Sequence, residues 1–379
     1  MSLTRASSRP VKTKTSEKWR SLDPVLLLVS LALSVFGIFA VYVAGTDDRQ
    51  AYAANQALGF AVGLAGAVPL AFVDYRVWQR YLRPIYVLIV AMLLAVILAG
   101  AAAGGAQRWI DIGPVQVQPS EFAKLLVVVV LAGYIAESPI RENLTFLKSL
   151  GVLSIPAILV FIQPDLGTAL VFGAVFVTMT YIGGARLYQI GALGALAVLG
   201  AVVAFKADIL QGYQKDRLTV FIDPQGSGDV GYQVAQSKTA IGSGGLTGKG
   251  LDATTLANLG FLPEDHTDFI FSNLAERLGF IGGMVLLVLF LVLIWRILHI
   301  ATISRDRFGV LIAVGVATIF LFHVFVNVGM TMGIMPVTGI PLPFISYGRS
   351  SLVVSVLSLG LLQSIAMHSR AEYSKHPNV

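Results

Sequence analysis

The densest group of ionisable side chains lies in residues 260–279, G-F-L-P-E-D-H-T-D-F-I-F-S-N-L-A-E-R-L-G. Asp268 stands apart from the other acids because three apolar residues, F-I-F, follow it directly. A carboxylate at the rim of an apolar layer is partly desolvated, which suits a general base that takes a proton from a substrate. The competing interpretation is structural: Asp268 or Thr267 caps the helix that follows.

The same stretch also offers candidate metal ligands, because Asp265, His266 and Glu276 accompany Glu264 and Asp268. A single histidine among carboxylates does not match a zinc site. Asp268 and Glu264 do offer the oxygen ligands that suit a hard cation such as Mg²⁺ or Mn²⁺. The sequence therefore leaves a divalent cation open as a cofactor and predicts no organic cofactor. Cysteine is absent, which excludes a disulfide framework and a thiolate metal site.

A second pair of charges, Glu121 and Lys124, stands near the start of an apolar run in V-Q-P-S-E-F-A-K-L, residues 117–125. Pro119 suits the first turn of a helix, and residues three apart share one helix face, so the two charges can form an ion pair. A charge at mid-membrane costs about 2.5–3.5 kcal/mol on insertion scales, so such charges usually pair or line a cavity. The pair is predicted to shape a cavity, with a purely structural tie between helices as the alternative.

Asp165 lies in a tight turn between two apolar runs, in F-I-Q-P-D-L-G-T-A-L. An aspartate just ahead of an apolar run is most often a helix N-cap. We therefore predict a capping role for Asp165.

Basic residues in the polar region 207–273 are candidates for binding an anionic substrate. Arg217 and Lys238 are of the types that clamp a diphosphate, since arginine matches phosphate with two parallel hydrogen bonds. Ordinary solvated charge is the alternative, and it is favoured for Lys215 and Lys249. The glycine-dense run I-G-S-G-G-L-T-G-K-G-L, residues 241–251, lacks the spacing of a P-loop and is equally compatible with a phosphate nest and with plain turns.

The composition of the chain is that of a membrane protein. Of 379 residues, 56% are hydrophobic and 13% are charged, and the mean hydropathy is +0.77. A soluble domain carries about 25% charged residues, so most of this surface must face lipid. The net charge of +6 is concentrated in short loops and tails, which fits membrane topology and predicts no nucleic-acid partner.

Apolar runs of spanning length predict an all-α integral membrane protein with about ten transmembrane helices. The predicted spans are residues 24–44, 54–73, 84–103, 119–136, 146–162, 166–183, 187–206, 274–295, 308–330 and 350–367. Residues 21–369 form one membrane domain between a disordered basic tail, 1–20, and a short tail, 370–379. Residues 207–273 form a large loop between helices 7 and 8.

The distribution of basic residues predicts that both termini are cytoplasmic. With the N-terminus inside, the cytoplasmic loops and tails hold 17 of the 27 lysines and arginines. The short loops on the other side hold only Arg49, Arg108 and Arg349. The long loop and Asp268 are then extracytoplasmic.

Five motifs in order make the chain resemble the SEDS family (shape, elongation, division and sporulation), and its RodA type more than its FtsW type. They are Ala106–Lys124, Gln163–Leu170, Gly231–Gly250, Phe261–Phe271 and Asn327–Leu352. The resemblance extends over residues 22–370. One departure is visible, because S-Y-G-R-S, residues 346–350, places Arg349 where the family usually has glycine.

The resemblance implies a ten-helix peptidoglycan glycosyltransferase that polymerises lipid II at the outer face of the bacterial cytoplasmic membrane during cell elongation. It implies a class B penicillin-binding protein as partner, within a complex of other elongation proteins. By motif position, the essential aspartate of the family falls on Asp268, and its acid and base on Glu121 and Lys124. Its loop arginines fall on Arg108 and Arg217. Lys238 or a divalent cation is a further candidate for binding the diphosphate.

Two other functions compete with the glycosyltransferase. A lipid II flippase would use Glu121 and Lys124 as pathway residues, but the sequence shows no inverted repeat of the kind common in transporters. A non-catalytic scaffold that recruits a penicillin-binding protein would leave the chemistry around Asp268 unexplained.

Overall fold

The computed structural model describes residues 21–44, 49–103, 106–113, 115–207, 228–251 and 266–373. Nine helices in these ranges are long and apolar enough to cross a membrane. They are α2 (Pro24–Ala44), α3 (Arg49–Phe72), α4 (Leu82–Ala99, preceded by the 3-10 helix η1, Tyr75–Tyr81), α5 (Pro119–Glu137), α6 (Asn143–Ile162), α8 (Leu187–Lys206), α11 (Ile270–Ile303), α12 (Arg307–Thr331) and α13 (Arg349–Tyr373). The shorter apolar helix α7 (Leu166–Ile182) completes the predicted ten.

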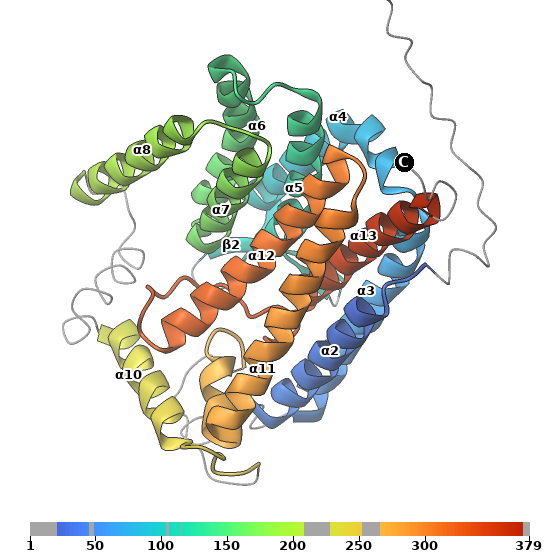
Figure 1. Cartoon of the computed structure of the whole chain (residues 1–379). Coiled ribbons are helices and arrows are strands. Elements are labelled where there is room, and N and C mark those ends of the chain that lie inside the picture. The colour runs from blue at the N-terminus through green and yellow to red at the C-terminus, as the bar shows by residue number, and fades with distance from the viewer. Residues whose placement is uncertain are drawn as a thin grey trace, which may run out of the picture.

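The all-α prediction is confirmed, and Figure 1 shows the helices packed into a bundle. Its centre consists of α5, α12 and α13, whose spans are 78%, 72% and 89% buried, against 6% for α8. Apolar side chains all around a helix are typical of such a central position. Helix α8 projects from the edge of the bundle in Figure 1 and exposes most of its side chains.

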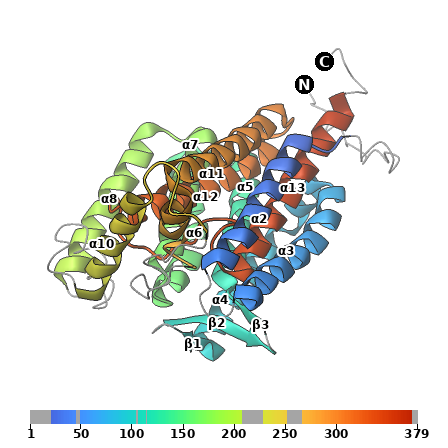
Figure 2. The ribbon, with the colours of Figure 1, turned by 90° about the horizontal axis from the view of Figure 1, so that it is seen from below.

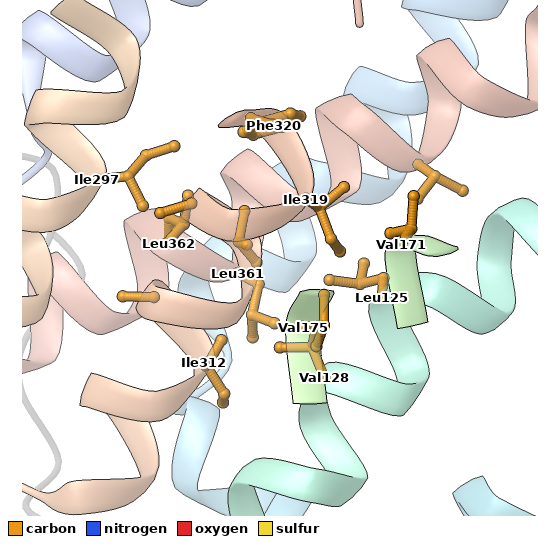
Figure 3. Packing of buried hydrophobic residues seen from close by; sticks show 14 of the residues in the cluster. Leu125, Val128, Val171, Val175, Ile297, Ile312, Ile319, Phe320, Leu361 and Leu362 are labelled. Atoms are coloured by element: carbon orange, nitrogen blue, oxygen red, sulfur yellow. The ribbon is translucent and has the colours of Figure 1, made fainter. Parts of the chain in front are cut away.

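The core is a continuous set of apolar side chains from helices α2 to α7 and α11 to α13, and Figure 3 shows part of it. Leu125 and Val128 of α5 pack with Val171 and Val175 of α7 in this set, and all four are buried. Close packing of this kind between apolar helices supplies van der Waals contact that lipid alone does not. The remaining labelled members are Ile297, Ile312, Ile319, Phe320, Leu361 and Leu362.

Small residues allow α3 and α13 to lie close together. A Cβ atom added at Gly63 would approach Val356 within 2.9 Å, and one at Gly360 would approach the backbone of Ala67 within 2.7 Å. Glycine at these positions removes the side chain that would separate the two backbones. The long contact between α3 and α13 fixes the place of the α13 N-terminus, where part of the candidate site lies.

Two features of the predicted helices are wrong in detail. The span predicted to reach residue 103 ends at Ala99, because Gly100 is extended and the chain turns into a small antiparallel sheet. This sheet has the order β1 (Ala101–Ala103), β2 (Ala106–Ile112) and β3 (Val115–Val117). The span predicted for residues 274–295 is instead the longer α11, which begins at Ile270 and is kinked at Gly279.

Ionic contacts define one end of the bundle. Asp23 accepts hydrogen bonds from Arg296 at 2.5 Å and from Arg370 at 2.6 Å, which joins α2, α11 and α13. At the same end, Arg76 donates to Asp306 at 2.9 Å, which joins η1 and α12. These three arginines are among the basic residues predicted to be cytoplasmic, and they lie at one end.

The opposite end carries the sheet, the helix α10 (Gly228–Ser243), residues 266–269 and the α12–α13 connection, residues 332–348. Figure 2 shows the sheet and α10 at separate edges of this end. The predicted loop 207–273 therefore contains a helix that the sequence did not predict. Residues 208–227 and 252–265, with Lys215, Arg217, Glu264 and Asp265, lie outside the described residues, as do the tail 1–20 and residues 374–379.

Candidate active site

Three hydrogen bonds anchor the main chain that carries Asp268. The backbone N–H of Tyr347 donates to the His266 carbonyl at 2.9 Å, and the Ser346 hydroxyl donates to the Thr267 carbonyl at 2.7 Å. The side-chain Nδ2 of Asn327 donates to the carbonyl of Asp268 itself at 3.1 Å. Three consecutive carbonyls are thus held from α12 and the α12–α13 connection, which fixes the backbone of residues 266–268.

Aromatic packing strengthens this anchor. The His266 ring lies 5.0 Å from the Tyr52 ring and 5.8 Å from the Tyr347 ring, and the two tyrosine rings meet edge to face. Gln56, also on α3, donates to the Ser346 carbonyl at 3.1 Å. Helix α3 therefore also supports the anchor of Asp268.

The backbone of residues 332–348 is unusual at Phe344, which has a φ of 66° and a buried side chain. A bulky residue in the left-handed region costs of order 1–3 kcal/mol and persists only where its surroundings determine it. Here the Phe344 turn directs Ser346 and Tyr347 at residues 266–267. Strain next to a fixed main chain that carries a candidate base is typical of functional sites.

Asp268 itself is half-buried and directly precedes α11. The N-cap position of α11 is Phe269, whose side chain makes no capping bond. The alternative interpretation, in which Asp268 or Thr267 is the N-cap, is therefore wrong. Asp165, in contrast, is an N-cap as predicted, since its carboxylate accepts from the Thr168 backbone N–H at 3.1 Å.

The pair formed by Glu121 and Lys124 is confirmed as an ion pair. Lys124 Nζ lies 2.7 Å from Glu121 Oε1, and both side chains are buried at the start of α5. Pro119 occupies the first turn of that helix, as predicted. A buried pair of this kind needs further polar partners to offset its desolvation.

Those partners line a small polar cavity between α5, α12 and α13. His323 Nε2 lies 3.2 Å from Lys124 Nζ, so the ammonium group is shared between a carboxylate and an imidazole. The serines of one face of α13 complete the polar lining: Ser351, Ser355 and Ser358. The cavity has about 10 Å³ accessible to a water molecule, which is room for about one water. A cavity at Glu121 and Lys124 is therefore present, but it is small.

Arg108 joins the sheet to the turn between α6 and α7. Its Nε donates to the Gln163 carbonyl at 3.2 Å, and its Nη2 donates to the Pro164 carbonyl. Lys238 of α10 is exposed and lies along Gly333. The strand β2, which carries Arg108, and the helix α10, which carries Lys238, are apart in both overall views (Figures 1 and 2).

The glycine-dense run is a set of turns that packs on the kink of α11. Lys249 N–H donates to the Glu276 carbonyl at 3.0 Å, Gly250 N–H donates to the Arg277 carbonyl at 3.1 Å, and Phe280 N–H donates to the Gly245 carbonyl at 2.9 Å. Gly279 has a φ of 66°, and a Cβ atom there would collide with the glycine run. These contacts favour the turn interpretation over a phosphate nest.

Lys249 is not an ordinary solvated charge, contrary to the prediction. Its Nζ lies 2.6 Å from Oε1 of Glu276, whose side chain is fully buried. The neighbouring Arg277 is also buried, and it donates to Asn273 Oδ1 at 2.8 Å and to the Leu251 carbonyl at 2.7 Å. These groups hold the turns of residues 244–251 against α11, beside the segment of Asp268.

Four residues of the site were not assigned roles from the sequence: His323, Asn327, Ser346 and Tyr347. A role for His323 and Asn327 could have been predicted from the sequence, because polar and ionisable residues inside an apolar helix are rare and usually functional. The roles of Ser346 and Tyr347 could not have been predicted, because they depend on how the α12–α13 connection folds back.

Across the described ranges, no group of three histidine or acidic side chains converges to hold a metal ion. Glu264, the other predicted ligand, lies outside those ranges. A cation held entirely by the described side chains therefore does not fit. A cation held by one carboxylate together with substrate phosphates and water remains compatible with Asp268, since Mg²⁺ is commonly bound in this way.

The chain matches the FtsW/RodA/SpoVE family model, described as cell cycle protein, over residues 22–371. It is 38% identical over 355 residues to the peptidoglycan glycosyltransferase MrdB of Escherichia coli K12, covering 92% of this chain and 94% of MrdB.

Two solved structures are similar over almost their whole length. The rod shape determining protein RodA of Thermus thermophilus has a TM-score of 0.71 at 28% identity, covering 94% of this chain and 99% of that one. A chain from a peptidoglycan synthase complex, described as coordinating polymerization and crosslinking, has a TM-score of 0.81 at 28% identity, covering 93% and 99%.

Proposed function

Because the chain belongs to the FtsW/RodA/SpoVE family, which agrees with its SEDS resemblance, we propose that it is a peptidoglycan glycosyltransferase of the RodA type. It is a multi-pass membrane protein that polymerises lipid II into glycan strands for cell elongation. Its two termini are cytoplasmic, and the end that carries Asp268 faces the outside of the cytoplasmic membrane. The single observation that supports this site most strongly is the triple anchor of residues 266–268.

Asp268 acts as the general base. It accepts the proton of the acceptor sugar hydroxyl as that oxygen attacks the anomeric carbon of the donor, and the bond from that carbon to the diphosphate breaks with inversion. A positioned base of this kind contributes about 10²–10⁴ in rate. Its effect depends on geometry, which the three hydrogen bonds to residues 266–268 supply.

The leaving undecaprenyl diphosphate gathers negative charge, which cationic groups stabilise. Lys238 is the described candidate whose side chain is exposed at this end, and Arg217 is a further candidate from the same loop. Arg108 already donates to two carbonyls, so it serves first to hold the sheet beside the α6–α7 turn. A divalent cation bound by Asp268 and the diphosphate would neutralise the same charge.

Glu121 and Lys124 shape the interior beneath the site. Because their cavity has room for about one water, they act on the protein around Asp268 and not on a sugar directly. A lipid II flippase would also need buried charges of this kind. The experiment must therefore distinguish polymerisation of lipid II from its transport across the membrane.

The protein works with a class B penicillin-binding protein that cross-links the strands it makes, among other membrane proteins of the elongation complex. This proposal is supported by the likeness to a chain from a complex that coordinates polymerization and crosslinking. Lipid II reaches the site from the bilayer, so its lipid tail and the surrounding membrane lipids contact the apolar helix faces.

The test is polymerisation of purified lipid II by the detergent-solubilised protein with its partner, comparing wild type, Asp268→Asn and the control Glu142→Gln. Glu142 is an exposed carboxylate just before α6 and lies outside the five motifs. We expect glycan chains from wild type and the control, and none from folded, partner-bound Asp268→Asn. Equal chain formation by all three would remove Asp268 as the base. Lipid II crossing liposomes with no chain formation by wild type would favour the flippase.

A further inference from the structure

His323 is a buried ionisable residue in the middle of an apolar helix, and the proposed reaction does not yet use it. It is 2% exposed on α12. Its Nδ1 lies 3.0 Å from the Pro341 carbonyl oxygen, and its Nε2 lies 3.2 Å from Lys124 Nζ. One ring thus contacts both the buried ion pair and the α12–α13 connection.

The partners of the ring determine its protonation. A carbonyl oxygen can only accept a hydrogen bond, so the proton of the ring lies on Nδ1, which donates to Pro341. A lysine ammonium group can only donate, so Nε2 carries no proton and accepts from Lys124. In this arrangement His323 is neutral, and Lys124 donates to both Glu121 and the imidazole.

The next residue along this face of α12 is Asn327, one helical turn from His323. Asn327 Nδ2 donates to the Ile340 carbonyl at 2.8 Å, and His323 donates to the adjacent Pro341 carbonyl. The same Asn327 amide group donates to the Asp268 carbonyl. The carbonyls of Ile340 and Pro341 are thus held by two side chains of α12. One of these side chains, Asn327, also contacts Asp268, and the other, His323, also contacts Lys124.

We propose that His323 is a positioning residue for the glycosyl transfer: it holds Lys124 against Glu121 and holds Pro341, so that residues 332–348 keep the main chain of Asp268 in place. The inference deepens the proposed function and rests on it. A substrate-binding role does not fit, because the cavity at His323 holds about one water and no sugar or phosphate.

Two substitutions separate the two contacts. The amide of asparagine mimics Nδ1 of histidine, so His323→Asn keeps a donor for Pro341 and loses the acceptor for Lys124. The amide of glutamine mimics Nε2, so His323→Gln keeps an acceptor for Lys124 and loses the donor for Pro341. His323→Leu removes both. Phe325→Leu, at a side chain that is 58% exposed on the same helix, is the control.

The first experiment measures kcat and KM for lipid II polymerisation by each variant in complex with the partner. We expect kcat to fall about tenfold in each amide variant and about 100-fold or more in His323→Leu, with KM within about twofold, because small displacements of a catalytic group have effects of this size. Wild-type kcat in His323→Gln and His323→Asn would overturn the inference, even if His323→Leu does not fold.

The second experiment needs no activity. Nuclear magnetic resonance of protein labelled with ¹⁵N-histidine, with the His323 signals identified by their loss in His323→Gln, reports which ring nitrogens carry protons. A neutral ring protonated at Nδ1 supports the arrangement, and a ring protonated at Nε2 or at both nitrogens overturns it. If the wild-type protein makes no glycan, the proposed function is wrong. If the wild-type protein is active and the His323 variants are equally active, only this inference is wrong.

Discussion

The Asn327 side chain holds the main chain of Asp268, with Nδ2 of Asn327 lying 3.1 Å from the Asp268 carbonyl oxygen. Asn327 is fully buried, and its Oδ1 has no hydrogen-bond partner within the part of the chain that the structure describes. An unpaired buried carbonyl oxygen costs about 1–3 kcal/mol. Asn327 therefore holds the carbonyls of Asp268 and Ile340 while its own unpaired oxygen lowers the stability of the fold. Such a loss of stability is common at functional sites.

Replacing Asn327 with leucine should lower activity more than stability. Leucine has a similar volume but cannot donate, so the Asp268 and Ile340 carbonyls lose a shared partner. We expect kcat for lipid II polymerisation to fall about 10- to 100-fold with KM within about twofold. Phe325→Leu is the control, because that side chain faces outward from α12. Unchanged kcat in Asn327→Leu would show that this bond does not position Asp268.

The Ser346 hydroxyl is the second point of attachment, and it can be tested separately. It donates to the Thr267 carbonyl at 2.7 Å and accepts from the Leu342 N–H at 2.8 Å, so alanine at this position loses both bonds. We expect Ser346→Ala to lower kcat about tenfold and Ser346→Thr to retain most of it. Ser154→Ala is a matched control, because the Ser154 hydroxyl donates to the Leu150 carbonyl of its own helix. Equal activity of the alanine and threonine variants would mean that the hydroxyl is dispensable.

Much of the fold follows from local sequence properties. Apolar length predicts the membrane-crossing helices, and single-residue rules predict the Pro119 first turn, the Asp165 cap and the Glu121–Lys124 pair. These features depend on residues within one helix turn of each other.

The anchor of Asp268 could not be predicted in this way. The bond from Ser346 to Thr267 joins residues 79 positions apart, and the bond from Asn327 joins residues 59 apart. Such pairings depend on the left-handed turn at Phe344, which no local rule predicts for a bulky residue. The prediction that Lys249 is an ordinary solvated charge is wrong for the same reason, because its partner Glu276 lies 27 positions later in the chain, on α11.

Removing Lys249 should destabilise the protein, because the fully buried Glu276 carboxylate would lose the ammonium group that lies 2.6 Å from it. We expect Lys249→Met to lower the free energy of unfolding by about 1–3 kcal/mol, less than for a fully buried pair since Lys249 is one-third exposed. The double variant Lys249→Met with Glu276→Gln should recover part of this loss. Melting temperatures in detergent provide the measurement.

The control for that experiment is Lys206→Met, at an exposed lysine on the last turn of α8. If Lys206→Met and Lys249→Met lower the melting temperature equally, the destabilisation reflects the change in net charge and not the contact with Glu276. Additive effects in the double variant would mean that Lys249 and Glu276 are not coupled.

At the opposite end of the bundle, Asp23 should make stability depend on pH. Burial alone would raise the pKa of this carboxyl, but hydrogen bonds from Arg296 and the Leu26 N–H, with the charges of Arg296 and Arg370, lower it below the ordinary value of 3.8. A group with a lowered pKa stabilises the folded state above the unfolded pKa and loses that contribution as the pH falls through the folded pKa. Asp23→Asn should therefore melt below wild type at pH 7, by an amount that shrinks as the pH falls below about 4. Asp111→Asn, at an exposed carboxylate, is the control for the substitution itself. A wild-type to Asp23→Asn difference that stays constant from pH 7 to about pH 3 would contradict the ionic role of Asp23 in joining α2, α11 and α13.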